Sequence, residues 1–271
     1  MLDQALRKDF QGEVLFDPFS RGRYSTDASF YQIMPMGVAI PRGMADVAAA
    51  LAVARDHGVA VTGRGGGTSQ CGQTVNSGLI LDNSVHFNRI LELDVPNRRV
   101  VVEPGIVLDD LNRALRPHGL WFPVDVSTAS RATIGGMAAN NSCGGRSLRY
   151  GTMRDNVLSI EAIMADGRLA RFGPVDVDGH GGGDGGPPAG LVDALLAMGR
   201  DHAALIDARI PKLTRRVGGY NIDALVPLRL VHAAVGKGAR AEPAAQLERE
   251  RIADDRAGDA PEHHLDRIEH A

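Results

Sequence analysis

The sequence has few aromatic residues, which make up 4% of its 271 positions. Its core must therefore be built mainly from Ala, Val, Leu and Ile. An excess of positive charge is also missing, because the formal net charge is -3. Domains that bind nucleic acid usually carry a clustered basic surface, so this composition argues against nucleic acid as a partner.

Cysteine is scarce, with Cys71 and Cys143 as the two thiols. Nothing indicates a disulfide scaffold, so we expect a reducing compartment and interpret both residues as buried packing groups. No His/Cys/carboxylate cluster has metal-ligand spacing, so no metal site is expected. No apolar run approaches the roughly 18 residues of a membrane span, and the start MLDQALRKDF lacks the apolar segment of a signal peptide. The expected location is the cytoplasm or the inner face of a membrane.

Strand and helix patterns alternate along most of the chain. The first 35 residues read as an irregular lead-in that covers one edge of the core. Beyond them, the pattern predicts strands at 38–40, 59–62, 78–82 and 99–105, helices between 41 and 58, at 107–119 and at 191–211, and a hairpin over 156–173. This alternation predicts an α/β or α+β domain.

The stretch TGRGGGTSQCG at 62–72 places consecutive glycines directly after an apolar run. It is not a Walker A loop, because Gly67 rather than lysine precedes Thr68, and its glycines do not have the Rossmann spacing. A formal G-x-G-x-x-G occurs at 181–186. It follows no predicted strand and lies in a glycine tract, so we interpret it as accidental.

A phosphate-binding nest remains as one interpretation of the 62–72 stretch. Successive glycines let backbone N–H groups point into one concavity, where Thr68, Ser69 and Arg64 would add further donors. A flexible surface turn is an equally good interpretation of this stretch alone. A second glycine segment, TIGG at 133–136, lies within a long polar stretch. Two such segments together could clamp a diphosphate.

Three stretches resemble, in order and spacing, the FAD-binding domain of the vanillyl-alcohol-oxidase-type flavoproteins, also called the PCMH-type FAD domain. They are VAVTGRGGGTSQCG, VVVEPGIVLDDLNRALRPHGLWFPVD and TIGGMAANNSCGGRSLRYGTMRDNVLSIEAI. The resemblance runs from about Ser20 to Pro227 and is strongest to FAD-linked D-2-hydroxyacid dehydrogenases. It implies an α+β fold of two α/β subdomains with FAD extended between them. No histidine flanks the glycine loop, so the FAD is expected to be non-covalent.

The resemblance also implies which residues bind the cofactor. They comprise the glycine loop, a Pro…Ser stretch, the TIGG…Asn segment, a Tyr-Gly pair and a valine whose backbone faces the adenine end. By number these are Arg64, Gly65, Gly66, Gly67, Thr68, Ser69, Pro123, Ser127, Thr133, Gly135, Gly136, Asn141, Tyr150, Gly151 and Val157. The catalytic groups of the family are implied to lie in a substrate cap domain that this chain lacks, so no catalytic residue is predicted.

The chain is accordingly divided into a lead-in at 1–35, an FAD domain at 36–227 and a tail at 228–271. The tail departs from the family, is expected to be disordered, and is explained by the hypothesis of a frameshift or a truncated gene. The implied reaction is hydride transfer from a D-2-hydroxyacid, such as D-lactate, D-2-hydroxyglutarate or glycolate, to FAD. An electron acceptor or a completing subunit is the further partner. Two alternatives remain open: an FAD-binding module with no turnover by itself, and an enolpyruvyl-sugar reductase on the same domain.

Overall fold

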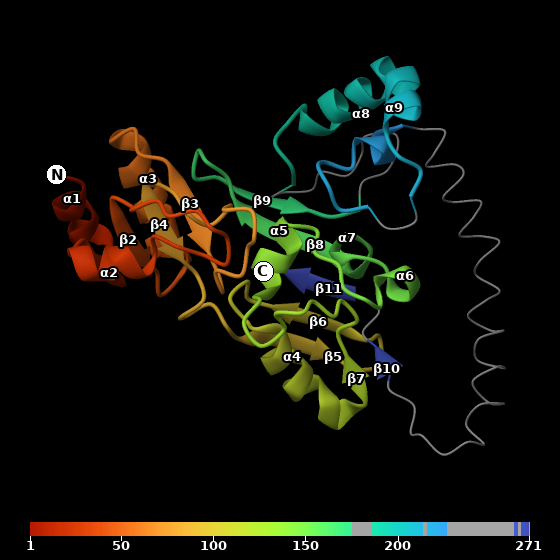
Figure 1. Cartoon of the computed structure of the whole chain (residues 1–271), viewed down its shortest axis with the longest axis horizontal. Coiled ribbons are helices and arrows are strands. Elements are labelled where there is room, and N and C mark those ends of the chain that lie inside the picture. Colours follow the sequence, from red (N-terminus) through yellow and green to blue (C-terminus); the bar gives the residue numbers. More distant parts are fainter. Residues whose placement is uncertain (175–185, 214–215, 227–262, 265–266, 271) are drawn as a thin grey trace. The chain divides into compact units, whose positions relative to one another are not determined.

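The computed structural model describes residues 1–174, 186–213, 216–226, 263–264 and 267–270. Two compact units are formed, one by Met1–Pro174 with His264–Ala271 and the other by Val175–His263. The helices are α1 Leu2–Asp9, α2 Pro18–Arg23, α3 Met44–Asp56, α4 Leu108–Leu115, α5 Ile134–Ala139, α6 Ser147–Tyr150, α7 Met153–Asn156, α8 Leu191–Asp201 and α9 Ala203–Arg209, with 3-10 turns at Arg116–His118 and Ile222–Leu225 (Figure 1). The strands are β1 Glu13–Leu15, β2 Gly37–Ile40, β3 Val61–Arg64, β4 Leu79–Asp82, β5 Ile90–Asp94, β6 Arg99–Val102, β7 Leu120–Trp121, β8 Val157–Ile163, β9 Leu169–Phe172, β10 His263–His264 and β11 Arg267–His270.

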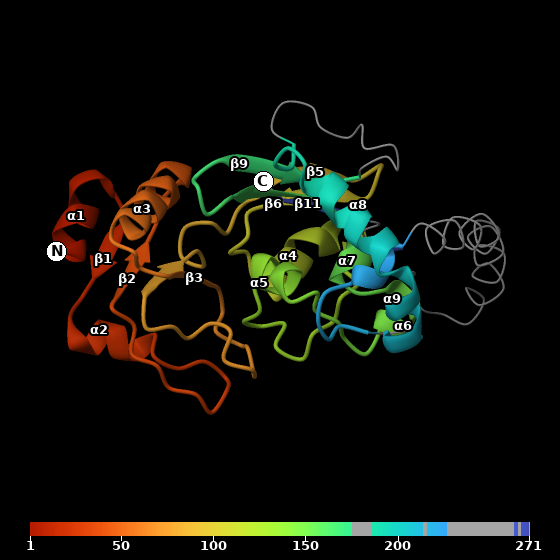
Figure 2. The same ribbon diagram turned by 90° about the horizontal axis from the view of Figure 1, so that it is seen from above.

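The first sheet has the order β1-β2-β4-β3, with β2, β4 and β3 parallel and β1 antiparallel at one edge. Figure 2 shows α1 and α3 on one side of this sheet and α2 on the other. Both faces are therefore covered, and β2 and β4 are buried along their whole length, as expected for parallel strands. The face toward α1 and α3 carries Ala39, Leu79 and Leu81. The opposite face carries Val38, Ile40 and Ile80.

Strand β3 ends at Arg64 and leads directly into the glycine loop. The loop thus begins at the carboxyl end of a parallel strand, which is where open α/β sheets commonly bind their ligands. Helix α3 precedes β3 in the chain. Its buried apolar residues are Ala50 and Ala54, and Leu51 is only half-buried. Both alanines belong to the core on this face of the sheet.

The second sheet has the order β5-β6-β11-β8-β9. Its outer pairs are antiparallel, whereas β11 runs parallel to both β6 and β8. Helix α4 ends as expected before Gly119, which adopts a left-handed conformation with φ 67°. The core below this sheet is formed by Val100, Val102, Ile106, Leu108, Leu111, Leu115, Leu120, Phe122, Val124, Ala132, Ile134, Met137 and Met153.

Parts of the chain differ from what the sequence predicts. The lead-in at 1–35 is not irregular, because it forms α1, β1 and α2. The expected helix at 191–211 is two helices that meet at His202. In the tail, β11 is a strand where none was expected, because a short segment there pairs with two strand edges at once. Apart from β10 and β11, the tail lies outside the described residues, as does nearly all of the 181–186 motif.

The part of the chain that the structure describes contains no helix both long enough and apolar enough to cross a membrane.

Candidate functional site

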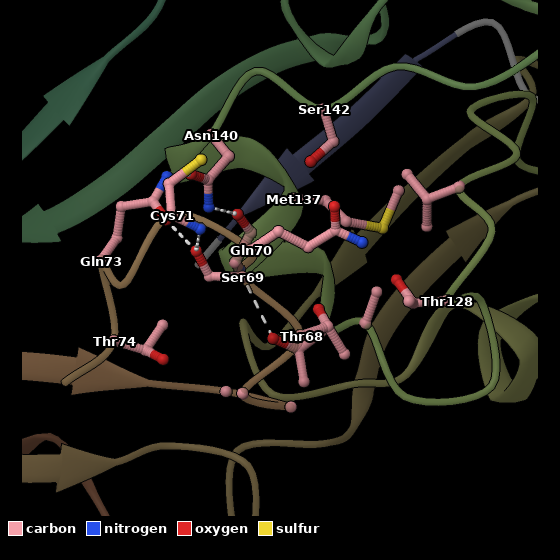
Figure 3. A pocket seen from close by; sticks show the side chains of 17 residues that line it. Thr68, Ser69, Gln70, Cys71, Gln73, Thr74, Thr128, Met137, Asn140 and Ser142 are labelled. Carbon is pink, nitrogen blue, oxygen red and sulfur yellow. Dashed lines mark hydrogen bonds between the residues drawn. The ribbon is translucent and has the colours of Figure 1, made fainter. Parts of the chain in front are cut away.

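A cavity of about 200 Å³ lies between the glycine loop and the segment around α5, within the first unit (Figure 3). One wall comes from 65–74, which follows β3. The other comes from 126–142, which includes α5. The lining residues are Gly65, Gly66, Gly67, Thr68, Ser69, Gln70, Cys71, Gln73, Thr74, Val126, Thr128, Ala132, Thr133, Gly136, Met137, Asn140 and Ser142.

The two walls meet where the backbones approach most closely. A Cβ atom added at Gly65 would overlap the hydroxyl of Thr133, and one added at Gly66 would overlap the carbonyl oxygen of Arg131. These two positions therefore require glycine for space rather than for an unusual φ. The two glycine segments predicted to cooperate are indeed brought together by the fold.

Arg64 holds the glycine loop from the side of residues 24–28. Its guanidinium donates to the carbonyl oxygens of Thr26 at 2.8 Å and of Thr74 at 3.3 Å. The same group lies against Gly67, where φ is 63°, and the Gly67 carbonyl accepts a hydrogen bond from the N–H of Ala28. The Arg64 side chain is thus engaged with the loop itself and is not part of the cavity lining.

Asp27 adds a second tie between the lead-in and the loop. Its carboxylate accepts hydrogen bonds from the N–H of Ser29 and from the hydroxyl of Thr74, the latter at 2.9 Å. Burial raises the pKa of Asp27, but the hydrogen bonds from Ser29 and Thr74 outweigh it and hold the pKa below its ordinary value. The carboxylate is therefore charged at neutral pH and fixes Thr74 at the end of the loop.

The lining carries hydroxyl, amide and backbone N–H groups. None of the lining residues, all of which the structure describes, has a charged side chain. The described residues also contain no group of three or more His, Cys, Asp or Glu side chains that could hold a metal ion. A lining of this kind offers neutral hydrogen bonds to a ligand, as backbone nests do, and no ion pair from a lining side chain.

The family model described as "FAD binding domain" matches residues 35–173, just over half of the chain. The chain belongs to this FAD-binding family. Among curated relatives, a D-2-hydroxyglutarate dehydrogenase of Pantoea ananatis is 37% identical over 226 residues, covering 82% of this chain and 22% of its own length. Glycolate oxidase subunit GlcD of Bacillus subtilis is 40% identical over 167 residues, or 60% of this chain and 35% of its own. The chain thus spans only about a fifth of the length of the D-2-hydroxyglutarate dehydrogenases that it matches across most of its residues.

Solved structures show the same fold at low sequence identity. An alkyldihydroxyacetonephosphate synthase aligns with a TM-score of 0.58 at 19% identity, covering 66% of this chain and 38% of that one. The D396N variant of Physcomitrella patens BBE-like 1 aligns with a TM-score of 0.57 at 23% identity, covering 64% and 38%. The described part of the FAD-binding chain therefore has the two-subdomain α+β fold of the vanillyl-alcohol-oxidase-type flavoenzymes, as its sequence predicts.

Seven of the predicted cofactor-binding residues line the cavity of this FAD-binding domain. They are Gly65, Gly66, Gly67, Thr68, Ser69, Thr133 and Gly136. Thr133 is the N-cap of α5, and its hydroxyl accepts a hydrogen bond from the N–H of Gly136 at 3.4 Å. The second glycine segment is thereby shaped by its own threonine.

Gly135 and Asn141 lie beside the cavity but do not line it. Gly135 packs against Pro104, whose carbonyl accepts its N–H at 2.8 Å. Asn141 has a left-handed φ of 45° and accepts hydrogen bonds from the hydroxyl of Thr152 and the N–H of Arg154. Both residues hold the lining segment in place.

The remaining predicted residues also lie outside the cavity lining. Pro123 is buried and Ser127 is exposed. The Tyr150 ring packs edge-on against Trp121 at 5.4 Å. Gly151 has φ 84° and leaves no room for a Cβ beside Asp155, and Val157 is the first residue of β8.

Ten lining residues are not among the predicted cofactor-binding residues. They are Gln70, Cys71, Gln73, Thr74, Val126, Thr128, Ala132, Met137, Asn140 and Ser142. Cys71 also corrects an expectation, because its thiol is exposed instead of buried, while Cys143 is half-buried and both are free. The loop that carries Cys71 leaves it at the cavity wall, where no core is available to cover it. Nearness to the glycine motif was the one signal that could have identified Gln70–Thr74.

Proposed function

We propose that this chain provides the FAD-binding domain of a flavin-linked dehydrogenase that oxidises a small D-2-hydroxyacid. Family membership supports the cofactor, and the relatives named D-2-hydroxyglutarate dehydrogenase and glycolate oxidase subunit support the substrate class. An electron acceptor is the further partner of such a reaction. The free thiols Cys71 and Cys143 favour a reducing compartment, the cytoplasm or the inner face of a membrane.

The observation that carries the proposal is the meeting of the two glycine segments at a cavity lined by neutral donors. Its volume is smaller than the roughly 300–1,000 Å³ typical of whole small-molecule sites, so the cavity would hold one part of an extended dinucleotide. Backbone N–H groups of Gly65–Gly67 and the hydroxyl of Thr68 suit a diphosphate bridge. The absence of room for side chains at Gly65 and Gly66 shows that the two segments touch there, which keeps both walls of the cavity together.

When bound, FAD supplies the hydride-accepting group of the reaction. The lining residues bind and orient the cofactor. None of them is a histidine, carboxylate or lysine, so the described lining offers no general base for the substrate hydroxyl. We therefore expect the groups that remove this proton and bind the substrate carboxylate to lie outside this cavity.

Visible absorbance of the purified chain, with and without added FAD, tests the cofactor assignment. We expect a flavin spectrum, and we expect acid precipitation of the protein to leave the flavin in solution, because the binding is proposed to be non-covalent. A chain that neither retains FAD nor binds it in a titration would refute the assignment. A yellow pellet would refute only the non-covalent mode.

A second candidate function is FAD binding without turnover, completed by another segment or subunit. It is favoured by the lack of a general base among the described lining residues. Dye-linked reduction with D-2-hydroxyglutarate, D-lactate and glycolate separates the two functions. Bleaching of the flavin by one of these acids supports the dehydrogenase, and bound flavin that none of them bleaches supports the binding role. Bleaching by NADPH alone would instead indicate a reductase.

A further inference from the structure

A chain of side-chain hydrogen bonds joins the two walls of the cavity at its exposed rim. The amide nitrogen Nε2 of Gln73 donates to Oδ1 of Asn140 at 3.0 Å, which links residues 67 positions apart (Figure 3). On the glycine-loop side, the Gln73 amide oxygen accepts a hydrogen bond from the Ser69 hydroxyl. On the α5 side, the Asn140 amide nitrogen donates to the carbonyl of Gly136 at 2.9 Å.

These contacts fix the orientation of both amides. The carbonyl of Gly136 can only accept, so the Asn140 group facing it is the nitrogen and the group facing Gln73 is the oxygen. The Gln73 group facing Asn140 is then its nitrogen, which leaves its oxygen for Ser69. With both amides in this orientation, all three hydrogen bonds pair one donor with one acceptor.

The glycine loop is consequently held to the 131–140 segment at two points. One is the close approach of Gly65 and Gly66 to residues 131–133, and the other is the Gln73–Asn140 hydrogen bond. The cavity lies between them, and residues on both sides of it line the same space. The first contact cannot adjust without moving backbone, whereas the second is a single exposed hydrogen bond. At the rim, the amide pair links the two walls by side chains alone.

We propose that Gln73 and Asn140 are a positioning pair that holds the glycine loop and α5 at the spacing needed to bind the diphosphate part of FAD. This inference rests on the proposed function. The pair acts on FAD affinity by positioning the glycine loop, and neither amide needs to bond to the ligand. A neutral amide pair suits this position, because a carboxylate at the rim would repel the phosphates.

A double-mutant cycle on the intact chain tests the pair, with FAD and ADP as separate probes. Gln73→Ala and Asn140→Ala are each expected to weaken both probes by roughly threefold to tenfold, the usual range for one hydrogen bond. The double variant should bind about as weakly as either single variant, because the same contact is lost in each. The reciprocal swap Q73N/N140Q keeps the donor, the acceptor and the combined side-chain length, so it should restore most of the affinity.

The thermal stability of the variants without ligand separates positioning from a general structural role. Gln73 and Asn140 are both exposed, so the variants at these positions should melt close to the temperature of the unsubstituted protein. The control variant Gln4→Ala, at an exposed position on α1, should do the same. Additive losses would overturn the inference, because they indicate two independent ligand contacts. Unchanged affinity, or affinity that falls only together with the melting temperature, would overturn it too. If the unsubstituted chain binds neither probe, the proposed function itself fails.

Discussion

Gly66 offers the sharpest test of the close approach between the two glycine segments. In a Gly66→Ala variant, the new Cβ would stand 2.0 Å from the Arg131 carbonyl oxygen and 2.8 Å from its carbonyl carbon. Real Cβ atoms essentially never lie closer than 3.0 Å to a heavy atom of this kind, so the two backbones would have to separate by about 1 Å. The atoms in the way belong to the backbone, and no side-chain rotation can relieve the overlap.

Overpacking of this kind typically costs about 1–3 kcal/mol, which corresponds to roughly a 5- to 150-fold change in an equilibrium constant. The cavity beside the contact lets the loop move outward, so we expect the loss to fall mainly on FAD affinity. Titration of the variant with FAD, followed by flavin fluorescence, measures this loss. A melting curve without FAD reports how much of it appears as lost stability.

Gly63→Ala is the matched control in the same segment. A Cβ at Gly63 would meet nothing closer than the Asn83 side-chain nitrogen at 3.9 Å, which is an ordinary contact. This variant should bind FAD within about twofold of the unsubstituted chain, in the range of surface substitutions. If Gly66→Ala bound FAD as well as Gly63→Ala and melted at the same temperature, the backbone contact would have no part in the site.

Three further outcomes follow from the described contacts. Burial raises the pKa of Glu103, but the hydrogen bonds and the charge of Arg89 lower it by more, so the folded pKa lies below the ordinary value of 4.5. The ionised carboxylate therefore stabilises the fold above pH 4.5, and this stabilisation is lost as the pH falls through the folded pKa. Glu103→Gln should flatten the acid side of the profile of melting temperature against pH, and an unchanged profile would contradict this. Arg64→Met should weaken FAD binding by roughly twofold to tenfold, because the glycine loop loses its hydrogen bonds to the guanidinium. Arg64→Lys should bind FAD as weakly, because an ammonium cannot reach the carbonyls of both Thr26 and Thr74. Full affinity in the lysine variant would instead indicate a direct phosphate contact. In a Cys143→Ser variant, Cys71 is the remaining thiol, and it lines the cavity. Bound FAD should therefore slow the alkylation of Cys71 in proportion to the fraction of protein that holds FAD. Equal alkylation rates with and without FAD would place the cofactor elsewhere.

Much of the fold was predictable because local patterns and the final structure agree. The hairpin of β8 and β9 turns at Asp166-Gly167, with Gly167 at φ 86°, as that residue pair favours. The stop of α4 before Gly119 and the strand β4 were also predicted. In each of these cases one short stretch of sequence contains the whole signal.

One of the missed elements depends on contacts remote in sequence. Strand β11 has four residues and no strand pattern of its own, and it is defined by the edges of β6 and β8. The same holds at the site. A glycine motif predicts the loop, but the engagement of Arg64 with Thr26 and the pairing of Gln73 with Asn140 join segments that the sequence does not place side by side. The sequence therefore identifies the glycine core of the site better than its rim.

The central place of β11 has a consequence for the order of folding. Arg267 pairs with Arg99, so these hydrogen bonds join positions 168 residues apart. Such distant pairings form late, because the entropy of closing the intervening chain is lost before the contact is gained. Until then β6 and β8 expose unsatisfied donors and acceptors to any extended peptide nearby. Refolding should accordingly become less efficient as the protein concentration rises.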